Sequence, residues 1–530
     1  MFLLASNIEL SEQDRFFSVT ELFSSLINTL KMRDSNIMTT SELEKFLKEK
    51  FHELARATLE AKLNMIGELE AESVVKGSDG VIHPRKKLVE RTIKTIFGKV
   101  TYKRWGYSAD NGSRLFPADG HLNLPPEKYT HEIRRLVSED ITKSSYDETL
   151  DTLFQRNAVT VPKRQSLELT NRASQDFTDF YNNPLNRQEE SDVLVNNTGS
   201  LLILTTDGKG VVMRHESLRE ATRKAAEKEQ HKLQKRLTAG EKKDRKRMAQ
   251  VASVYTIAPH IRTVDEIISL TPTLAEKKKE RPRPENKRVW ASVEQEPELV
   301  IKEIFQESQA RDPRHEKQWI ALVDGNKKQL CVMKEQAKAF NVTLTIIIDI
   351  IHIIEYLWKA SYAFYKDGDF LCEQFVTKHL LLVLQGQSNH VANEIKMMAT
   401  ESKLSETKLK SVDTCASYLL KYQEYLQYDK YLVQGFPIAT GVIEGACRYL
   451  VKDRMDITGA RWGLTGAEAV LRLRSLRVSG DFNEYWSYHE KKEQERNHSS
   501  KYENGLPPLR NNKSESDQPK TRGHLRLVKG

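Results

Sequence analysis

The stretch LLILTTDGKG, residues 201–210, is the starting point for the fold of this 530-residue chain. A run of apolar and β-branched residues, typical of a buried strand, leads directly to Asp207, and glycines flank Lys209. The pattern predicts a strand that delivers a carboxylate at its end. Asp-Gly is also common turn chemistry, so a strand that simply ends in a turn is the alternative.

Four more apolar runs follow this stretch, and their order predicts a mixed sheet. Helical patterns separate the third run from the fourth and the fourth from the fifth. Three strands in a row followed by alternating helices and strands indicate a mixed five-stranded sheet with helices on its faces. In such a sheet the first and fourth strands can be neighbours. The five runs are 201–206, 249–257, 288–293, 319–323 and 342–350.

The N-terminal part of the chain is predicted to be mainly helical, with one hairpin. A helix is expected over residues 40–72, with Ser41 and Glu44 as its capping box. Two alternating runs then meet at Gly98-Lys99, which indicates a hairpin with glycine at the first turn position.

Residues 129–178 also have helical periodicity. Two amphipathic stretches are separated by AVTVP, and Pro162 suits the start of the second helix, which opens with Lys163 and Arg164. This arrangement predicts a DNA-binding helix-turn-helix. An ordinary helical hairpin without DNA contact is the alternative.

The charge of the chain is unevenly distributed. Charged residues make up 30% and hydrophobic residues 38% of the sequence, which is enough apolar material for a core. The net charge is +9, and Lys209 to Arg247 alone contains 14 basic and 6 acidic residues, a local +8. Such a concentration favours a polyanionic partner, although a solvated charged helix has the same composition.

Cysteine usage and hydropathy exclude several classes of protein. The 4 cysteines have no metal-ligand spacing and form no disulfide framework, which argues against a zinc domain. The most apolar run, TLTIIIDIIHIIEYLW, is too short to span a bilayer and contains three ionisable residues. We therefore expect no membrane partner.

Three carboxylates occupy positions that suggest a cation site. Asp207 ends the first predicted strand, Asp324 ends the fourth, and Glu444 lies in a late helix. Carboxylates are the ligands for hard cations such as Mg²⁺, and their use without Cys or His argues for Mg²⁺ or Mn²⁺ over zinc. Two such ions about 3.5–4 Å apart can activate the attacking oxygen and stabilise the leaving one in phosphoryl transfer.

Basic residues surround the third carboxylate. Arg448 and Lys452 follow Glu444 at steps of four, which places them on the same face of a regular helix. Basic side chains beside a metal-binding acid suit a phosphate backbone. An ordinary surface helix with i,i+4 pairs is the alternative. Further DNA-contacting candidates in the next segment are Arg454, Arg461 and Trp462.

Several motifs together resemble bacterial insertion-sequence transposases of the ISKra family. They are LTTDGKGV, ALVDGN, DIIHIIEYLWKA and TGVIEGACRYLVKDRMDITGARW. IKTIFGKVTYKRWGY and LFPADGHLNLP resemble that family's leading region, so the likeness spans roughly residues 90–480. The last motif is long and specific, whereas TDGKG or VDG alone would be weak evidence for the resemblance.

This resemblance implies a DDE transposase whose catalytic domain has the RNase H-like fold. Asp207, Asp324 and Glu444 would be its metal-binding triad, and Asp349 and His352 would match a supporting D-x-x-H element. The implied fold class is α/β, with a mixed five-stranded RNase H-like sheet flanked by helices. An all-α insertion would interrupt it, and a mainly helical DNA-binding region would precede it.

Six segments are expected along the chain. They are a helical region (1–84), a hairpin plus helix-turn-helix-like region (85–190), the first part of the catalytic core (191–366), the all-α insertion (367–432), the final core helices (433–489) and a disordered basic tail (490–530).

Asp324 and Asp349 both follow apolar strands, so the pattern alone permits either as the second acid. Sheet geometry favours Asp324. With the fourth strand beside the first and the fifth one place farther out, Asp349 would lie about 9–10 Å from Asp207, against about 5 Å for Asp324.

The predicted function is cleavage of insertion-sequence ends and joining of their 3′ hydroxyls to target DNA by two-metal phosphoryl transfer. Lys209 would meet a phosphate, and the glycines beside it would let DNA approach. Expected partners are Mg²⁺, with Mn²⁺ as a substitute, double-stranded DNA (terminal inverted repeats and target), and further copies of the chain assembled on DNA. Nothing indicates a guide RNA, and the expected location is the bacterial cytoplasm, with the nucleoid.

Two alternatives remain open at this point. One is a non-catalytic DNA-binding protein derived from a transposase. The other is an RNase H-like nuclease without strand transfer.

Overall fold

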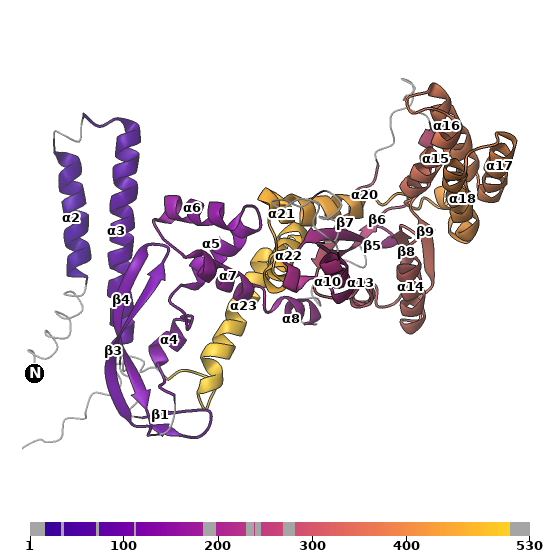
Figure 1. Cartoon of the computed structure of the whole chain (residues 1–530). Helices are drawn as coiled ribbons and strands as arrows, with labels where there is room; N and C mark the ends of the chain where they lie inside the picture. Colours follow the sequence, from indigo (N-terminus) through magenta and orange to yellow (C-terminus); the bar gives the residue numbers. More distant parts are fainter. Residues whose placement is uncertain are drawn as a thin grey trace, which may run out of the picture. The chain divides into compact units, whose positions relative to one another are not determined.

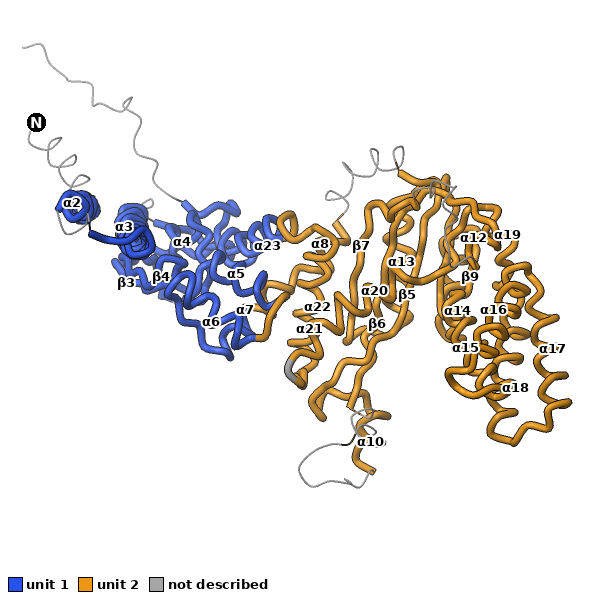
Figure 2. The backbone as a smooth tube through the Cα atoms, turned by 90° about the horizontal axis from the view of Figure 1, so that it is seen from above, with its two compact units in different colours: residues 1–141, 146–169, 486–530 blue, residues 142–145, 170–485 orange. Residues whose placement is uncertain are grey.

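The chain forms two units. The computed structural model describes residues 16–32, 37–69, 74–110, 113–183, 198–228, 238, 245–268 and 281–508 (Figure 1). Unit 1 comprises residues 1–141, 146–169 and 486–530, and unit 2 comprises residues 142–145 and 170–485 (Figure 2). Residues 229–237 and 239–244 of the basic stretch at 209–247 lie outside the described residues.

A five-stranded mixed sheet forms the centre of unit 2, in the order β7-β6-β5-β8-β9 (Figure 1). β6 is antiparallel to both β5 and β7, whereas β8 is parallel to β5 and to β9. The predicted contact between the first and fourth strands is thereby confirmed. The strands are β5 (Leu201–Val212), β6 (Lys246–Ile257), β7 (Glu285–Ser292), β8 (Gln318–Val323) and β9 (Leu344–Ile348).

β5 is longer than the sequence indicates, and Asp207 does not end it. Pairing with β8 stops at Thr205↔Leu322, but pairing with β6 continues to Val212↔Lys246. The prediction of a strand end at residue 206 is therefore wrong, because β6 supplies an antiparallel partner on the other side. Asp207 lies where β5 has passed the end of β8.

Helices cover the sheet, as its continuous apolar strands require. α13 (Pro297–Arg311) packs on β5 and β6, and α22 (Leu464–Ser479) packs on β7. The connection from β8 to β9 contains α14 (Lys327–Ala339). The predicted helical stretches between the last three strands are thus confirmed.

Among the described residues, the elements that follow β9 are all helices. Within them, α15 packs against both α16 and α18 (Figure 1). No helix among the described residues is both long enough and apolar enough to cross a bilayer. The helices are α15 (Ile350–Phe364), α16 (Phe370–Leu384), α17 (Ser388–Glu401), α18 (Glu406–Lys421), α19 (Tyr428–Val433) and α20 (Gly441–Ala446).

The segment after α20 is irregular and is attached to the extension of β5. A π-helical turn, η5 (Cys447–Lys452), leads into the short α21 (Asp453–Met455). The Trp462 amide donates to the Val212 carbonyl at 3.1 Å, and the Trp462 carbonyl accepts from the Arg214 amide at 2.7 Å. The extra length of β5 therefore has a structural role, since it holds this segment in place.

In unit 1, the long helix α3 (Thr40–Gly67) packs against α2 (Phe17–Lys31) and against the hairpin of β3 (Arg85–Thr95) and β4 (Gly98–Ser108). Two details differ from expectation. The capping box of α3 is Thr39 with Glu42, because the helix begins at Thr40 and Ser41 already lies inside it. Thr95 pairs with Gly98, so the turn residues are 96–97, and Gly98 begins β4 with a φ of 103° that suits glycine.

The predicted pair of helices is present in unit 1 as α6 (Tyr146–Asn157) and α7 (Lys163–Ala173). They share a hydrophobic core with α5 (His131–Ile141). Val159 and Val161 of the connecting AVTVP segment are buried in the same core, which fixes the turn between the helices. The core residues are Tyr129, Ile133, Val137, Leu153, Val159, Val161 and Leu169.

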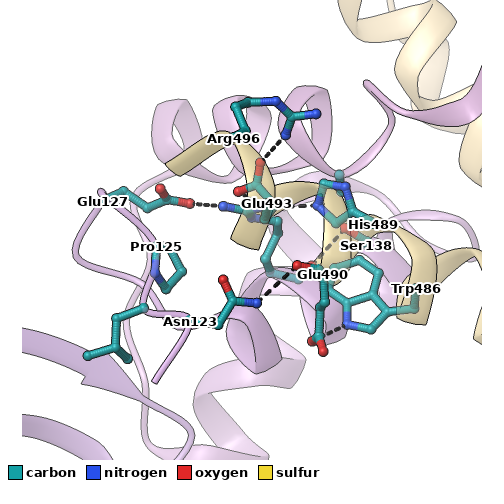
Figure 3. A network of polar contacts seen from close by, with 12 residues as sticks. Asn123, Pro125, Glu127, Ser138, Trp486, His489, Glu490, Glu493 and Arg496 are labelled. Carbon is teal, nitrogen blue, oxygen red and sulfur yellow. Dashed lines mark hydrogen bonds and ion pairs between the residues drawn. The ribbon is translucent and has the colours of Figure 1, made fainter. Parts of the chain in front are cut away.

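A buried charge network joins α23 (Phe482–Asn497) to α5 within unit 1 (Figure 3). Arg134 is 0% exposed; it donates to Glu493 at 2.7 Å and to Nε2 of His489 at 2.9 Å, and it also pairs with Glu127. Residues 490–508 are therefore ordered, contrary to the predicted disordered tail. Residues 509–530 of that tail lie outside the described residues.

Candidate functional site

Asp207 and Asp324 lie on neighbouring strands at the same edge of the unit 2 sheet. Asp324 directly follows β8, and extending the β5–β8 register by two residues brings Asp207 level with it. Parallel strands are about 4.8 Å apart. Burial raises the pKa of Asp324, and the negative charge of Asp207 raises it further, although an amide hydrogen bond from Asn326 and the charge of His352 oppose this rise. The two carboxylates therefore interact electrostatically.

Glu444 approaches the same region from α20, which packs on β5 and β6. Its carboxylate is exposed, and Oε1 lies 3.3 Å from the hydroxyl of Thr440. Cys447, three residues later, donates from Sγ to Oδ2 of Asp207 at 3.3 Å. Burial and the charge of Asp207 raise the pKa of the Cys447 thiol, and Glu444 also contributes to this rise. Cys447 thus lies between the first and third predicted acids.

The sequence did not single out Cys447. The available signal was its position one helical turn after Glu444, which places both residues on one face of the helix.

The three acids are not assembled as a ligand set. Within the described ranges, no group of three or more His, Cys, Asp or Glu side chains could hold a metal ion. The pair Asp207–Asp324 still offers carboxylate oxygens that suit Mg²⁺ or Mn²⁺. A cation there would relieve the repulsion that raises the pKa of Asp324. These two residues fit the proposed ion, and Glu444 would need a side-chain movement to join them.

Asp349 is directed into the protein. It is 0% exposed and caps α15, accepting from the Ile351 amide at 3.1 Å through Oδ1. The same oxygen accepts from the Thr440 amide at 3.1 Å, and the Thr440 hydroxyl donates to Oδ2. Asp349 is thus the N-cap residue of α15. Through Thr440 it also fixes the residue that precedes the helix of Glu444.

The basic residues after Glu444 lie in a turn that is not α-helical. Arg448 and Lys452 are exposed, and both lie in the π-helical turn η5. Arg448 is 3.9 Å from Asp453. Arg461 is also exposed, whereas Lys209 is half-buried on β5.

Arg454 and Trp462 are interior residues, which corrects their prediction as DNA contacts. Arg454 is 2% exposed and Trp462 is 7% exposed. The guanidinium lies 4.9 Å from the centre of the indole ring, and the indole N–H donates to the Met455 carbonyl at 2.9 Å. The two side chains pack inside the segment that follows η5, so neither is available at the surface to contact DNA.

Lys163 and Arg164 lie in unit 1, at the start of α7. Their side chains are 63% and 90% exposed. Lys163 pairs with Asp147 at 2.7 Å and Arg164 with Glu168 at 3.4 Å, both at the surface. Both basic groups are therefore accessible, and exposed pairs of this kind are weak enough to exchange for phosphate contacts.

No protein-family model matches this chain, and no curated protein matches it in sequence. The function must therefore be argued from the geometry of the site together with the motif resemblance.

Proposed function

We propose that this protein is a DDE-type DNA transposase of the ISKra kind, which cleaves insertion-sequence ends and joins their 3′ hydroxyls to target DNA. The observation that carries the proposal is the parallel β5–β8 register, which, when extended by two residues, brings the carboxylates of Asp207 and Asp324 to the same end of neighbouring strands. The third acid, Glu444, is supplied from a helix packed on the same strands.

The sheet supports an RNase H-like assignment. Its order places the first strand at the centre, beside an antiparallel second strand and a parallel fourth strand. The four helices α16 to α19 lie between Asp324 and Glu444 in sequence, as the proposed all-α insertion would.

In this proposal Asp207 and Asp324, joined by Glu444, hold Mg²⁺ or Mn²⁺. The cation would activate the attacking oxygen and stabilise the leaving oxygen. The protein's own groups position the DNA: Lys209, Arg448, Lys452 and Arg461 would contact phosphates. Water would be the first nucleophile and the freed 3′ hydroxyl the second, without a covalent protein intermediate.

The proposed partners are the terminal inverted repeats, the target DNA and further copies of the chain assembled on DNA. The bacterial cytoplasm, at the nucleoid, is the proposed location. Incubating the protein and Mg²⁺ with DNA that carries both element ends tests the function. Cleaved ends and joined products support it. Cleavage without joining would indicate a nuclease instead.

A non-catalytic DNA-binding protein is the second candidate. The observation that favours it is the lack of a gathered three-ligand group among the described residues. Specific binding of the element ends, with no cleavage in either Mg²⁺ or Mn²⁺, would support this candidate over the transposase.

The basic start of α7 should contribute to DNA binding. We expect the Lys163→Ala/Arg164→Ala double variant to bind element ends about 10-fold more weakly, with a shallower dependence on salt because two phosphate contacts are lost. Binding titrations at several salt concentrations measure both effects. The control, Lys302→Ala/Arg314→Ala, removes two exposed charges from unit 2. Equal losses in the two variants would show a non-specific charge effect only.

Asp349 should act as a positioning residue for Glu444 through Thr440. We expect Asp349→Asn to reduce cleavage about 10–100-fold and to raise the Mg²⁺ concentration needed for half-maximal cleavage, while end binding is retained. The matched control is Asp369→Asn, since Asp369 also caps a helix, α16, where its carboxylate accepts from the Leu371 amide at 3.0 Å. Unchanged Mg²⁺ dependence in Asp349→Asn would remove Asp349 from this role.

A further inference from the structure

A cleft of about 950 Å³ opens beside Asp324 in unit 2. The Asp324–Asn326 turn forms one side, α15 contributes His352 and Tyr356, and α18 forms the opposite wall. Because Asp324 is a proposed metal ligand, this cleft adjoins the place where the scissile phosphate would lie.

One face of α18 lines the cleft. Its lining residues recur at steps of three and four, the spacing that places side chains on one side of a helix. Thr414 and Ser417 supply hydroxyl groups, and Lys410 and Lys421 supply exposed cations. The lining residues from α18 are Glu406, Leu409, Lys410, Asp413, Thr414, Ser417, Tyr418 and Lys421.

Three tyrosine rings line part of the cleft, and contacts with one another and with the Asp324 turn hold them in position. The rings of Tyr356 and Tyr418 lie 4.3 Å apart, tilted by 30°, and Tyr422 packs against Tyr418 at 4.7 Å. The Tyr418 hydroxyl donates to the Asp324 carbonyl at 2.7 Å. A Cβ at Gly325 would lie 2.5 Å from that hydroxyl, so glycine is needed for the approach. The aromatic lining is thereby tied to the turn that carries Asp324.

The charges of the lining do not favour a cluster of phosphates over a flat, uncharged group. Apart from the proposed cation ligand Asp324, the lining holds two acids, Glu406 and Asp413, and two lysines, Lys410 and Lys421. These charges balance, so the rest of the lining does not select for a group rich in phosphates. A nucleobase would meet a ring on which it can stack, with hydroxyls and lysines at the margin for its sugar and single phosphate.

We propose that this cleft binds an unpaired nucleotide of the DNA strand next to the bond that is cut, with the base stacked on Tyr356. The identification of the strand as DNA rests on the proposed function. The support for stacking is the place of the Tyr356 ring in the cleft lining and the volume of the cleft. Tyr418 lies 4.3 Å from this ring, and Nζ of the exposed Lys359 lies 5.2 Å from its centre, so a stacked base would take the place of the Lys359 side chain.

Binding without catalysis tests this proposal. The full chain carrying Asp207→Asn, in metal-free buffer, is titrated with a short single-stranded oligothymidine and with the same oligonucleotide made abasic. We expect Tyr356→Ala to weaken binding of oligothymidine about 5–100-fold, as for loss of one base–aromatic stack, and to leave binding of the abasic strand unchanged. Tyr356→Phe keeps the ring and should bind within about 2-fold of the parent.

Tyr362→Ala is the matched control, because Tyr362 is an exposed tyrosine on the same helix and does not line the cleft. Ultraviolet crosslinking of an iodouracil-substituted oligothymidine to the parent protein provides a second measurement. Crosslinks at Tyr356, Tyr418 or Tyr422 support the proposal. Equal binding by the parent and Tyr356→Ala, or crosslinks confined to other segments, would overturn it.

The result is separable from the proposed function. A wild-type chain that binds the oligonucleotide through Tyr356 but never cleaves DNA would contradict the transposase alone. A chain that cleaves and joins DNA normally, with no effect of Tyr356→Ala on oligothymidine binding, would contradict the nucleotide cleft alone.

Discussion

Replacing Asp324 by Asn should abolish DNA cleavage and joining and, at the same time, raise the melting temperature at pH 7. The substitution removes one of two carboxylates that would hold the cation, and Asn can still accept the Asn326 amide hydrogen bond, which is 3.0 Å long in the wild type. Activity should fall to background, beyond the roughly 10–100-fold loss typical of outer-shell residues. End-labelled DNA substrates in Mg²⁺ and Mn²⁺ measure this loss.

The expected gain in stability follows from the direction of the pKa shift. Burial and the charge of Asp207 raise the pKa of Asp324 in the folded state. The protonated form is thus favoured by folding, so its stabilising contribution is present below the unfolded pKa of about 3.9 and is lost as the pH rises through the folded pKa. At pH 7 the ionised Asp324 is destabilising, and Asn removes that charge.

The melting temperature of Asp324→Asn should therefore exceed that of the wild type at pH 7, and the difference should shrink as the pH falls toward about 4. Asp367→Asn, an exposed acid of unit 2, serves as the control and should change neither activity nor melting temperature. A lower melting temperature for Asp324→Asn at pH 7 would contradict the electrostatic account of the pair.

Asp207→Asn and Glu444→Gln should also abolish cleavage and joining while end binding is kept. Near-normal strand transfer by either variant would exclude that residue from the triad. Iron-mediated hydroxyl-radical cleavage of the wild-type backbone would locate the cation directly. Cuts near residues 207, 324 and 444 are expected, and cuts at 349 without cuts at 324 would reverse the choice of the second acid.

The order and neighbours of the strands were predictable because apolar runs and their connections carry that information. The exact end of β5 was not, since Gly208, Lys209 and Gly210 have poor strand preference. Their strand conformation depends on antiparallel pairing with β6, a strand that begins at residue 246 and is therefore distant in sequence. Local sequence could therefore place Asp207 at the sheet edge but could not show that the strand continues past it.

The errors near Glu444 have a similar origin. Arg454 and Trp462 look like nucleic-acid contacts because basic and aromatic residues stand close together in sequence. Their burial follows from the attachment of residue 462 to the end of β5, a long-range contact without a local signal. The π-helical turn that contains Arg448 and Lys452 likewise has no local signal in the sequence.

The ordered part of the C-terminal segment was missed because its polar composition resembles that of a disordered tail. Its stability depends on charges that meet only in the folded unit. Burial alone would raise the pKa of Glu493. The charge of Arg134, the hydrogen bond that Arg134 donates, and the charges of His489 and Arg496 outweigh burial and lower that pKa to about 2. Burial and the charge of Arg134 also lower the pKa of His131 to about 3.

Removing Arg134 should destabilise unit 1 by about 3–5 kcal/mol, because a buried pair loses one partner and the Glu493 carboxylate loses its main cation. Arg134→Met tests this, and Arg135→Met is the matched control, since the ion pair of Arg135 with Glu139 is half-exposed and its loss should cost less than about 1 kcal/mol. The pKa of Glu493 is lower in the folded state than in the unfolded state. Its carboxylate therefore stabilises the folded state above a pH of about 4.3, and this stabilisation is lost as the pH falls toward about 2. Glu493→Gln should therefore flatten the acid dependence of stability in that window. Urea unfolding with hydrogen exchange across residues 131–141 and 486–497 measures both effects. Equal stability of Arg134→Met and Arg135→Met would show that the network does not hold α23 to unit 1.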